Sequence, residues 1–369
     1  MTTRPPTSPG LLERPGLLER PGLLESLADG PVICAEGYLF ELERRGYLQA
    51  GPFVPEVVLK HPEMVRQLHR DFVHAGSDVV EAFTYYGHRE KLRVIGKEEL
   101  LEPLNRDALA IAREVADESG ALFAGNICNT NLWEAAKPET QKAARAMFEE
   151  QVGWAVEAGV DFVIGETFSW LAEAMAALET IKAAGKPAVM TLAVAERVNL
   201  HDEIDPVEAC QRLADAGADV VGLNCLRGPA TMMPIVEKVR AKVSCHVAAL
   251  PVPYRTTPDT PTFYSFKDPH CDDLPDGRAF PSALDPFACH RYEMGAFARK
   301  AYDLGVRYLG VCCGAGPHHI RSVAEALGRQ PPASRYSPEM AKHAYLGTDP
   351  VIPESYKRYG RLRHPPARS

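Results

Sequence analysis

A pattern of apolar and polar positions recurs along the chain from Gly30 onward. A stretch of helical periodicity ends in glycine, one residue and a polar residue follow, and a β-branched apolar run comes next, at 75–80, 158–163, 216–221 and 304–309. The glycine suits the left-handed position that ends many helices. A short run that is apolar throughout predicts a strand buried on both faces.

Counting all such segments predicts eight strands that alternate with eight amphipathic helices. The strands are expected near 31–36, 78–83, 121–127, 161–166, 187–193, 218–224, 245–250 and 307–312. The helices are expected at 62–75, 104–118, 140–158, 169–184, 206–216, 229–242, 290–304 and 317–327. This alternation favours a (β/α)8 TIM barrel. The alternative is an open doubly wound sheet, but that fold usually has a glycine-rich phosphate loop after its first strand, and residues 34–38 do not form one.

The segments outside these elements divide the chain further. Two connections are long, 37–60 after the first strand and 251–289 after the seventh, and both are expected on the C-terminal rim, where barrels place their active sites. Residues 1–28 contain Pro-Gly-Leu-Leu-Glu three times, and proline every six residues prevents one continuous helix. We therefore predict a flexible leader over 1–28 that ends in a short helical turn, a barrel over 29–333, and a short C-terminal arm over 334–369 that contacts another subunit of a homo-oligomer.

Composition narrows the class of protein. The chain is 46% hydrophobic, as expected for a globular protein with a large core, and its net charge of −8 gives no reason to expect nucleic acid or an anionic membrane as partner. It contains neither an apolar run of about 18 residues nor the apolar segment of a secretory signal. We expect a cytoplasmic protein with small-molecule substrates.

Three of the nine cysteines stand where barrel chemistry is expected. Cys225 closes the sixth predicted strand, and Cys312 and Cys313 close the eighth, so their sulfurs can converge on one point of the rim. Because neighbouring residues of a strand point to opposite faces, Gly314 is expected to bend the chain and aim both cysteines inward. Three thiolates with one open position form a catalytic Zn²⁺ site. The alternatives are three buried thiols or a vicinal redox disulfide.

These residues carry a resemblance to a known family. The motifs Gly-x-Asn-Cys at 222–225 and Gly-x-Cys-Cys-Gly at 310–314, with Arg-Arg-Gly-Tyr at 44–47 and His-Arg-Asp-Phe at 69–72, resemble the homocysteine S-methyltransferase family, and its betaine–homocysteine branch in particular. The resemblance runs from about residue 24 to 332. It implies a zinc-bound homocysteine thiolate that takes a methyl group from a cationic onium donor such as a betaine, giving methionine.

The resemblance also implies roles for residues on the rim. Glu166 would hold the amino group of homocysteine, and Tyr86 would lie near both zinc and donor; these two are the candidate catalytic residues. Phe53 stands where the family has a donor-contacting tryptophan, and Tyr85 where it has a phenylalanine beside homocysteine. Asn224 precedes the first cysteine and is expected to orient that cysteine, Cys225, through a hydrogen bond. Phe168 is expected beside the other aromatic residues on a rim loop after the fourth strand, where an aromatic face could bind the donor cation. For each aromatic residue, ordinary packing is the alternative.

Four positions depart from the family pattern. Ala35 and Glu36 replace an acid followed by glycine, Ala82 replaces a threonine, and Thr167 replaces a tyrosine on the donor side. We expect Glu36 to take over the missing acid's role through a turn of the chain at the strand end. Because the substrate residues are altered, another donor (S-methylmethionine, dimethylsulfoniopropionate or another betaine) or another thiol acceptor is an alternative, and so is a zinc-binding barrel without catalysis.

Overall fold

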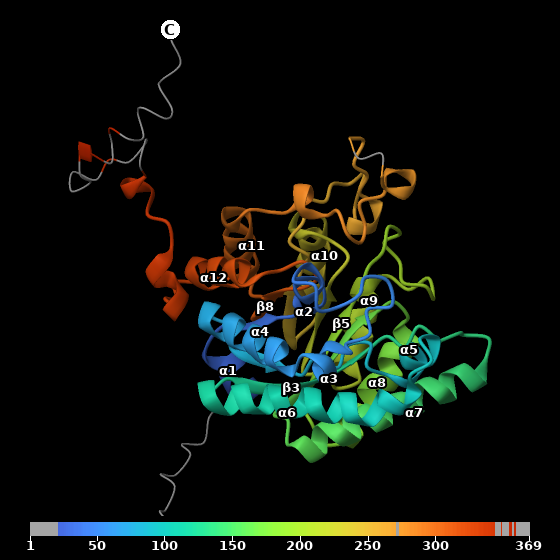
Figure 1. Ribbon diagram of the computed structural model, residues 1–369. Coiled ribbons are helices and arrows are strands. Elements are labelled where there is room, and N and C mark those ends of the chain that lie inside the picture. Colours follow the sequence, from blue (N-terminus) through green and yellow to red (C-terminus); the bar gives the residue numbers. More distant parts are fainter. Residues whose placement is uncertain (1–20, 271–272, 344–347, 349–353, 356–357, 359–369) are drawn as a thin grey trace, which may run out of the picture.

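The computed structural model describes residues 21–270, 273–343, 348, 354–355 and 358. Eight parallel strands form a closed barrel in the order β1 to β8, with helices around it (Figure 1). The strands are β1 (Val32–Ala35), β2 (Val79–Glu81), β3 (Leu122–Cys128), β4 (Phe162–Phe168), β5 (Ala188–Leu192), β6 (Val220–Asn224), β7 (His246–Leu250) and β8 (Tyr308–Val311). The predicted (β/α)8 barrel is confirmed, and the open sheet is excluded.

The helices between the strands follow the predicted periodicity closely. They are α4 (Pro62–Ala75), α6 (Leu101–Ser119), α7 (Pro138–Ala158), α8 (Leu171–Ala183), α9 (Pro206–Asp215), α10 (Pro229–Lys242), α11 (Arg291–Asp303) and α12 (Pro317–Ala326). Proline occupies the first turn of several of them. The backbone N–H groups of the first turn have no partner within the helix, so the missing N–H of proline costs no hydrogen bond there.

Three short helices were not predicted. They are α2 (Tyr38–Arg44) and α3 (Val57–Lys60), both inside the connection 37–60, and α5 (Arg89–Val94). In α2, Tyr38, Leu39 and Phe40 are buried in succession. A helix covered on more than one side has no apolar stripe of period 3.6, so periodicity could not reveal it.

The barrel interior is filled by alternate residues of the strands. The part toward the N-terminal ends of the strands, called the lower interior below, is apolar. It consists of Leu23, Leu27, Val32, Cys34, Val79, Leu122, Ala124, Phe162, Ile164, Val189, Val220, Ala248, Leu250 and Tyr308. The intervening strand residues, such as Ile33 and Ala35, belong to a second core between barrel and helices. Period-two alternation therefore decides which side chains reach the barrel axis.

Each end of the barrel is covered by a different segment. Helix α1 (Leu23–Asp29), which lies in the segment predicted as leader, buries Leu23 and Leu27 against the lower interior. The connection 251–289 contains the 3₁₀ turns η2 (Phe263–Ser265), η3 (Pro275–Gly277) and η4 (Asp285–Phe287). The leader's first 20 residues and most of the predicted arm beyond His343 lie outside the described residues.

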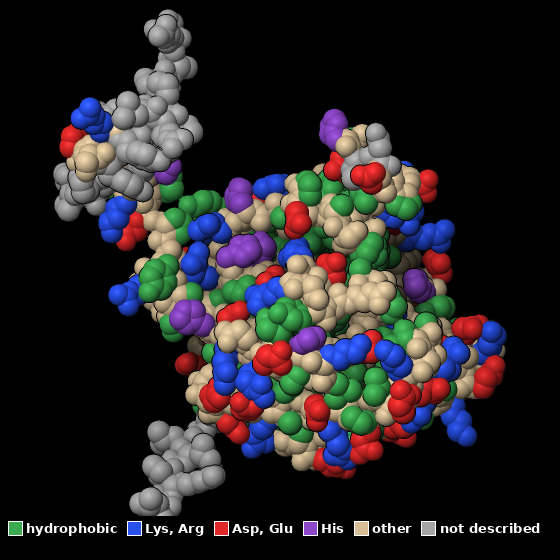
Figure 2. Space-filling model, viewed as in Figure 1, with side chains coloured by type: hydrophobic (Ala, Val, Ile, Leu, Met, Phe, Trp, Pro, Cys, Tyr) green, Lys and Arg blue, Asp and Glu red, His purple; other side chains and the backbone are tan. Residues whose placement is uncertain are grey.

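The outer helices carry charges of both signs. On the face in Figure 2, basic and acidic side chains are interspersed over α6 and α7, and pairs such as Arg106–Glu157 at 2.9 Å link the two helices. Among the described helices, none is both long and apolar enough to cross a membrane.

Candidate active site

Three cysteine sulfurs meet at the C-terminal end of the barrel. Cys225 follows β6, Cys312 and Cys313 follow β8, and all three Sγ atoms lie within 4.8 Å of one another and are buried. Cys225 adopts a left-handed backbone with φ of 57°, and Gly314 has φ of 92°. The bend expected at Gly314 is present, and both vicinal cysteines join the same cluster.

The spacing of these sulfurs fits a tetrahedral metal ion. A Zn–S bond of about 2.3 Å places two sulfurs about 3.8 Å apart, and three thiolates leave a fourth position for another ligand. Hydrogen bonds from Cys312 and Cys313 hold the pKa of the Cys225 thiol well below its ordinary value. Hydrogen bonding to Cys225 raises the pKa of Cys313, and burial raises that of Cys312. These directions favour a thiolate at Cys225, to which the thiols of Cys312 and Cys313 donate.

A layer of carboxylates and amides lies next to the sulfurs on the barrel axis. It consists of Glu36, Glu81, Asn126, Glu166 and Asn224, all buried. Each continues the inward-facing alternation of its strand: Glu36 comes two residues after Cys34, Glu81 two after Val79, and Glu166 two after Ile164. Glu36 therefore points inward without the special turn that we expected at the end of the first strand.

Two amides connect the three carboxylates. Asn126 Nδ2 donates to Glu81 Oε1 at 2.5 Å and to Glu166 Oε1 at 2.6 Å. Asn224 Nδ2 lies 2.7 Å from Glu166 Oε2, 3.3 Å from Glu36 Oε2 and 3.9 Å from Cys312 Sγ. Asn224 thus connects the acids to the sulfurs, and the cysteine that it contacts is Cys312 rather than the neighbouring Cys225.

This layer is short of positive charge and of hydrogen-bond donors. Burial raises the pKa of Glu166 to about 8 and, with repulsion from neighbouring acids, raises the pKa of Glu36 and Glu81 well above the usual range. Glu36 Oε1 and Asn126 Oδ1 are buried without a hydrogen-bond partner. Two unpaired acceptors among three carboxylates suit a ligand that brings several N–H donors and a positive charge.

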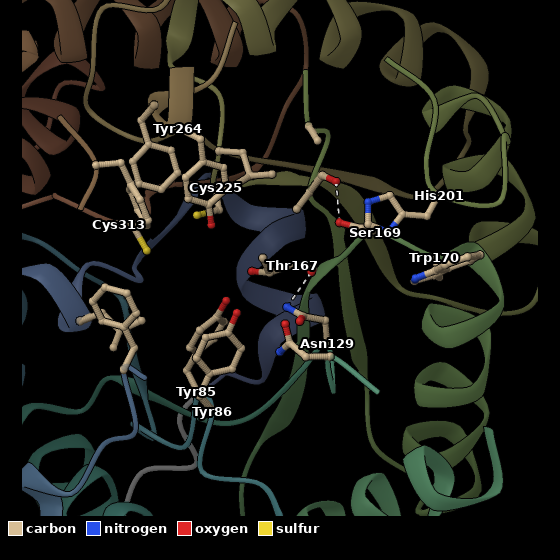
Figure 3. A pocket seen from close by; sticks show the side chains of 18 of the residues that line it. Tyr85, Tyr86, Asn129, Thr167, Ser169, Trp170, His201, Cys225, Tyr264 and Cys313 are labelled. Atoms are coloured by element: carbon tan, nitrogen blue, oxygen red, sulfur yellow. Dashed lines mark hydrogen bonds between the residues drawn. The ribbon is translucent and has the colours of Figure 1, made fainter. Parts of the chain in front are cut away.

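Above the sulfurs and acids, a cavity of about 400 Å³ opens across the barrel mouth (Figure 3). Its wall near the sulfurs is aromatic and includes Phe53, Tyr85, Tyr86, Phe263, Tyr264 and Phe280. Its lining contains no lysine or arginine among the described residues, and neither does that of the small cavity beside the acids. An aromatic face that no cation already covers can bind an onium group.

The residues predicted on the rim are found around these two cavities. Phe53, Tyr85, Tyr86 and Thr167 line the larger one, and Glu36 and Glu166 the smaller. The rings of Tyr85 and Tyr86 lie 4.3 Å apart, and burial raises the pKa of the Tyr86 hydroxyl to about 12, so it stays neutral. The Nζ of Lys91 lies 3.9 Å from the centre of the Tyr86 ring and covers one of its faces.

Two expectations about strand four need correction. Glu166 does not end the strand, because β4 continues to Phe168 with an irregular register and a positive φ at Thr167. Phe168 was expected on a rim loop, but it is fully buried and packs edge-on against Phe148 of α7. The irregularity leaves Thr167 beside the cavity, where its backbone N–H donates to Asn224 Oδ1 at 3.0 Å.

Sequence reasoning missed several residues of the site. Glu81 and Asn126 are polar residues within apolar strands, the same signal that identified Glu166, and could have been found by it. Tyr264, Trp133, Trp170 and His201 also line the cavity. They come from irregular segments, whose path across the barrel mouth follows from tertiary packing rather than from a local pattern.

Comparison with known proteins agrees with this geometry. The sequence model of the family described as homocysteine S-methyltransferase matches residues 33–327. Betaine–homocysteine S-methyltransferase 1 of Bos taurus is 39% identical over 318 residues, which cover 82% of this chain and 74% of the relative. S-methylmethionine–homocysteine S-methyltransferase of Pongo abelii is 37% identical over 325 residues, covering 84% and 83%.

Solved structures share the fold. The metallated form of the homocysteine methyltransferase MmuM of Escherichia coli superposes with a TM-score of 0.62 at 18% identity, over 81% of this chain and 98% of that one. The oxidized form gives a TM-score of 0.63 at 17% identity, with the same two shares covered. With the family match over most of the barrel, these findings show that the chain is a methyltransferase enzyme of the homocysteine S-methyltransferase family.

Proposed function

We propose that the protein is a zinc-dependent S-methyltransferase that moves a methyl group from a cationic onium donor to the sulfur of homocysteine, giving methionine. The observation that carries this proposal is the cluster of Cys225, Cys312 and Cys313 beneath an aromatic cavity whose described lining residues include no lysine or arginine. All-sulfur ligation favours Zn²⁺ over hard cations such as Mg²⁺. The metallated structure of MmuM supports a metal in this fold.

In this proposal the three cysteines hold the metal and leave one position open to the acceptor. Bound there, Zn²⁺ would keep the acceptor sulfur deprotonated near neutral pH, where a free thiol is mostly protonated. Asn224 positions Cys312 and the acids relative to each other through its amide. Cys225, Cys312 and Cys313 together also concentrate negative charge near the incoming donor, which attracts an onium cation.

Glu166 and Glu36 are the proposed partners of the acceptor's ammonium group. Their carboxylates lie with Cys312 Sγ in one cluster whose ligand atoms are all within 4.8 Å of one another. An ammonium group in this layer can donate hydrogen bonds to the unpaired Glu36 Oε1 and Asn126 Oδ1. Its positive charge also offsets the negative charge of the carboxylates, which is costly to bury without a partner. The amine is then held near the metal position, as homocysteine requires, because only two methylene groups separate its sulfur from the carbon that bears the amino group.

Phe53, Tyr85, Tyr86 and Thr167 are the proposed contacts of the donor. An onium methyl group held against these rings faces the acceptor sulfur across the cavity. During transfer the C–N or C–S⁺ bond of the donor breaks as a new C–S bond forms, and the electron pair stays with the leaving group. Thiolate and cation become neutral, so a site with little water supports the step. Both betaine and S-methylmethionine remain candidate donors, because relatives named for each are similarly close.

Metal dependence tests the proposal. Purified protein is expected to contain about one zinc per chain, to lose methionine formation from homocysteine and an onium donor after chelation, and to regain it with Zn²⁺. A Cys312→Ala, Cys313→Ala double variant should lose both metal and activity. Full zinc content in that variant, or undiminished turnover after zinc removal, would contradict the proposal.

Glu36 is tested separately, in a structure with acceptor bound. We expect a substrate nitrogen within hydrogen-bond reach of its carboxylate, directly or through one water. A nitrogen beyond that reach would remove Glu36 from the acceptor site and favour a different acceptor.

A further inference from the structure

The motif Arg-Arg-Gly-Tyr at 44–47 has no part in the proposed chemistry, yet its two arginines lie near the active site. Arg44 is the last residue of α2, and Arg45 caps that helix. Both side chains approach Glu41, one turn earlier on the same helix. Beyond it, Arg45 turns to Asp71 of α4 at 3.5 Å, whereas Arg44 reaches the turn that carries the vicinal cysteines.

The guanidinium of Arg44 joins two groups beside the sulfur cluster. Its Nη1 donates to the carbonyl oxygen of Gly314, the residue after Cys313, at 3.1 Å. Its Nη2 donates to the hydroxyl oxygen of Tyr254, also at 3.1 Å. Tyr254 is fully buried, and its hydroxyl lies so close to Gly314 that a Cβ there would be 2.2 Å away. The planar fork of Arg44 therefore holds the turn and the tyrosine in one arrangement.

Tyr254 follows the segment that separates the two cysteine-bearing strand ends. This segment continues β7, which lies between β6 and β8. The backbone N–H of Cys225 donates to the Leu250 carbonyl at 3.0 Å, and that of Cys312 donates to the Pro251 carbonyl at 3.0 Å. The backbone after β7 is thus hydrogen-bonded to a cysteine on each side, and Arg44 holds its continuation at Tyr254 against the turn after β8.

Arg44 also contacts a segment that forms part of the cavity wall. Its Nε lies 3.3 Å from Asp285 Oδ1 in the connection 251–289, whose aromatic residues line the cavity. The carboxylate of Asp285 is exposed, so this ion pair adds little stability. The hydrogen bonds to Gly314 and Tyr254 are the contacts through which Arg44 can act on the sulfur cluster.

We propose that Arg44 is a positioning residue for the metal site. Through the Gly314 carbonyl and the Tyr254 hydroxyl, it holds the turn after β8 in the shape that brings the vicinal cysteines to Cys225. This inference rests on the proposed function and adds a residue to its metal site. Lysine at position 44 keeps the charge but offers one nitrogen in place of two, so it cannot reproduce both hydrogen bonds.

Metal retention in two matched variants tests this role. Arg44→Lys and Arg45→Lys are loaded with Zn²⁺ and titrated with a chelator of known affinity, after circular dichroism has shown that they are folded. We expect the zinc dissociation constant to rise about tenfold or more in Arg44→Lys, as for other residues that orient metal ligands. Arg45→Lys should keep the wild-type value. Equal zinc affinity in the two variants would overturn the proposal.

The absorption spectrum of the Co²⁺-loaded protein separates positioning from general stability, because thiolate–Co²⁺ bands depend on the arrangement of the sulfur ligands. We expect changed bands in Arg44→Lys and in Tyr254→Phe, and wild-type bands in Arg45→Lys. Tyr254→Phe also tests the role if Arg44→Lys does not fold. The losses of metal affinity should be less than additive in the double variant, because both changes break one hydrogen bond. Wild-type bands in Tyr254→Phe and in folded Arg44→Lys would overturn the proposal.

Activity separates this inference from the proposed function. Methionine formation from homocysteine and an onium donor is measured with the same zinc-loaded proteins. Weaker metal retention in Arg44→Lys than in Arg45→Lys, with no methionine from any donor in the wild type, would support the positioning role and overturn the proposed function. Methionine formation by the wild type, with equal zinc affinity in both arginine variants, would do the reverse.

Discussion

Side chains reach the barrel axis only from alternate positions along each strand. Glu36, Glu81 and Glu166 each follow an apolar residue of the lower interior by two positions. The fold therefore places three carboxylates where water is excluded, and removing them from water costs free energy. Such a concentration of buried acid is a poor way to stabilise a core, and we propose that it is preorganised to bind an ammonium group.

Replacing Glu166 tests this at the acceptor. Glu166→Gln removes the charge and keeps the shape, so we expect kcat/KM for the acceptor to fall roughly ten- to hundredfold, the worth of a charged hydrogen bond, while zinc stays bound. Glu179→Gln, an exposed position on α8, is the matched control. Acceptor kinetics equal to those of the control would remove Glu166 from the site.

His69 provides a test of pH dependence away from the metal. It is buried on α4 beside Tyr38, neither ring nitrogen has a partner, and burial lowers its pKa to about 3. Between that pH and the ordinary 6.5, the unfolded chain binds a proton that the native state does not. The free energy of unfolding therefore decreases as pH falls from 6.5 toward 3, by up to about 1.4 kcal/mol per pH unit for this one histidine.

His69→Phe keeps an aromatic ring and cannot take up the proton. We expect the variant to unfold at a lower pH than the wild type in an acid titration followed by circular dichroism, with similar stability at pH 7.5. An unchanged acid midpoint would show that His69 is protonated without cost in the native state.

At the scale of elements, the turn after β8 positions the two vicinal cysteines of the proposed metal site. Gly314 has φ of 92°, and a Cβ there would lie 2.2 Å from the hydroxyl oxygen of Tyr254. Gly314→Ala should therefore displace Cys312 and Cys313 and lower zinc content in metal analysis. Gly328→Ala is the matched control, because it has a similar φ of 80° with nothing within 4 Å of the added Cβ, and it should retain zinc. Equal zinc content in both variants would refute this role of the turn.

Helix α1 contributes stability at the opposite end of the barrel. Leu27 is 2% exposed and packs in the lower interior, whereas Leu24 on the same helix is 40% exposed. We expect Leu27→Ala to cost about 2–5 kcal/mol of unfolding free energy and Leu24→Ala less than about 0.5 kcal/mol. Urea unfolding measures both, and a similar cost for the two variants would mean that α1 does not seal the barrel.

For the molecule as a whole, the regular elements and the convergence of the three cysteines were predictable from the sequence, and the cavity wall was not. Helices such as α4 and α10 begin and end where their proline and apolar periodicity indicate. The three cysteines follow from the positions of β6 and β8 in a barrel. Trp133 and Tyr264 reach the barrel mouth through irregular segments, so no local sequence pattern predicts their position. Helix α2 is buried on several sides and therefore lacks the apolar periodicity that would predict it. The homo-oligomer stays a prediction.

The central claim is that a methyl group passes from an onium donor to homocysteine at the three-cysteine site. The most direct measurement is mass spectrometry of methionine formed from homocysteine and a donor with deuterated methyl groups. The wild-type protein with zinc is expected to yield methionine carrying one trideuterated methyl group, and the Cys312→Ala, Cys313→Ala variant none. Absence of labelled methionine from the zinc-loaded wild type with every onium donor, or equal labelling by the double variant, would contradict the account.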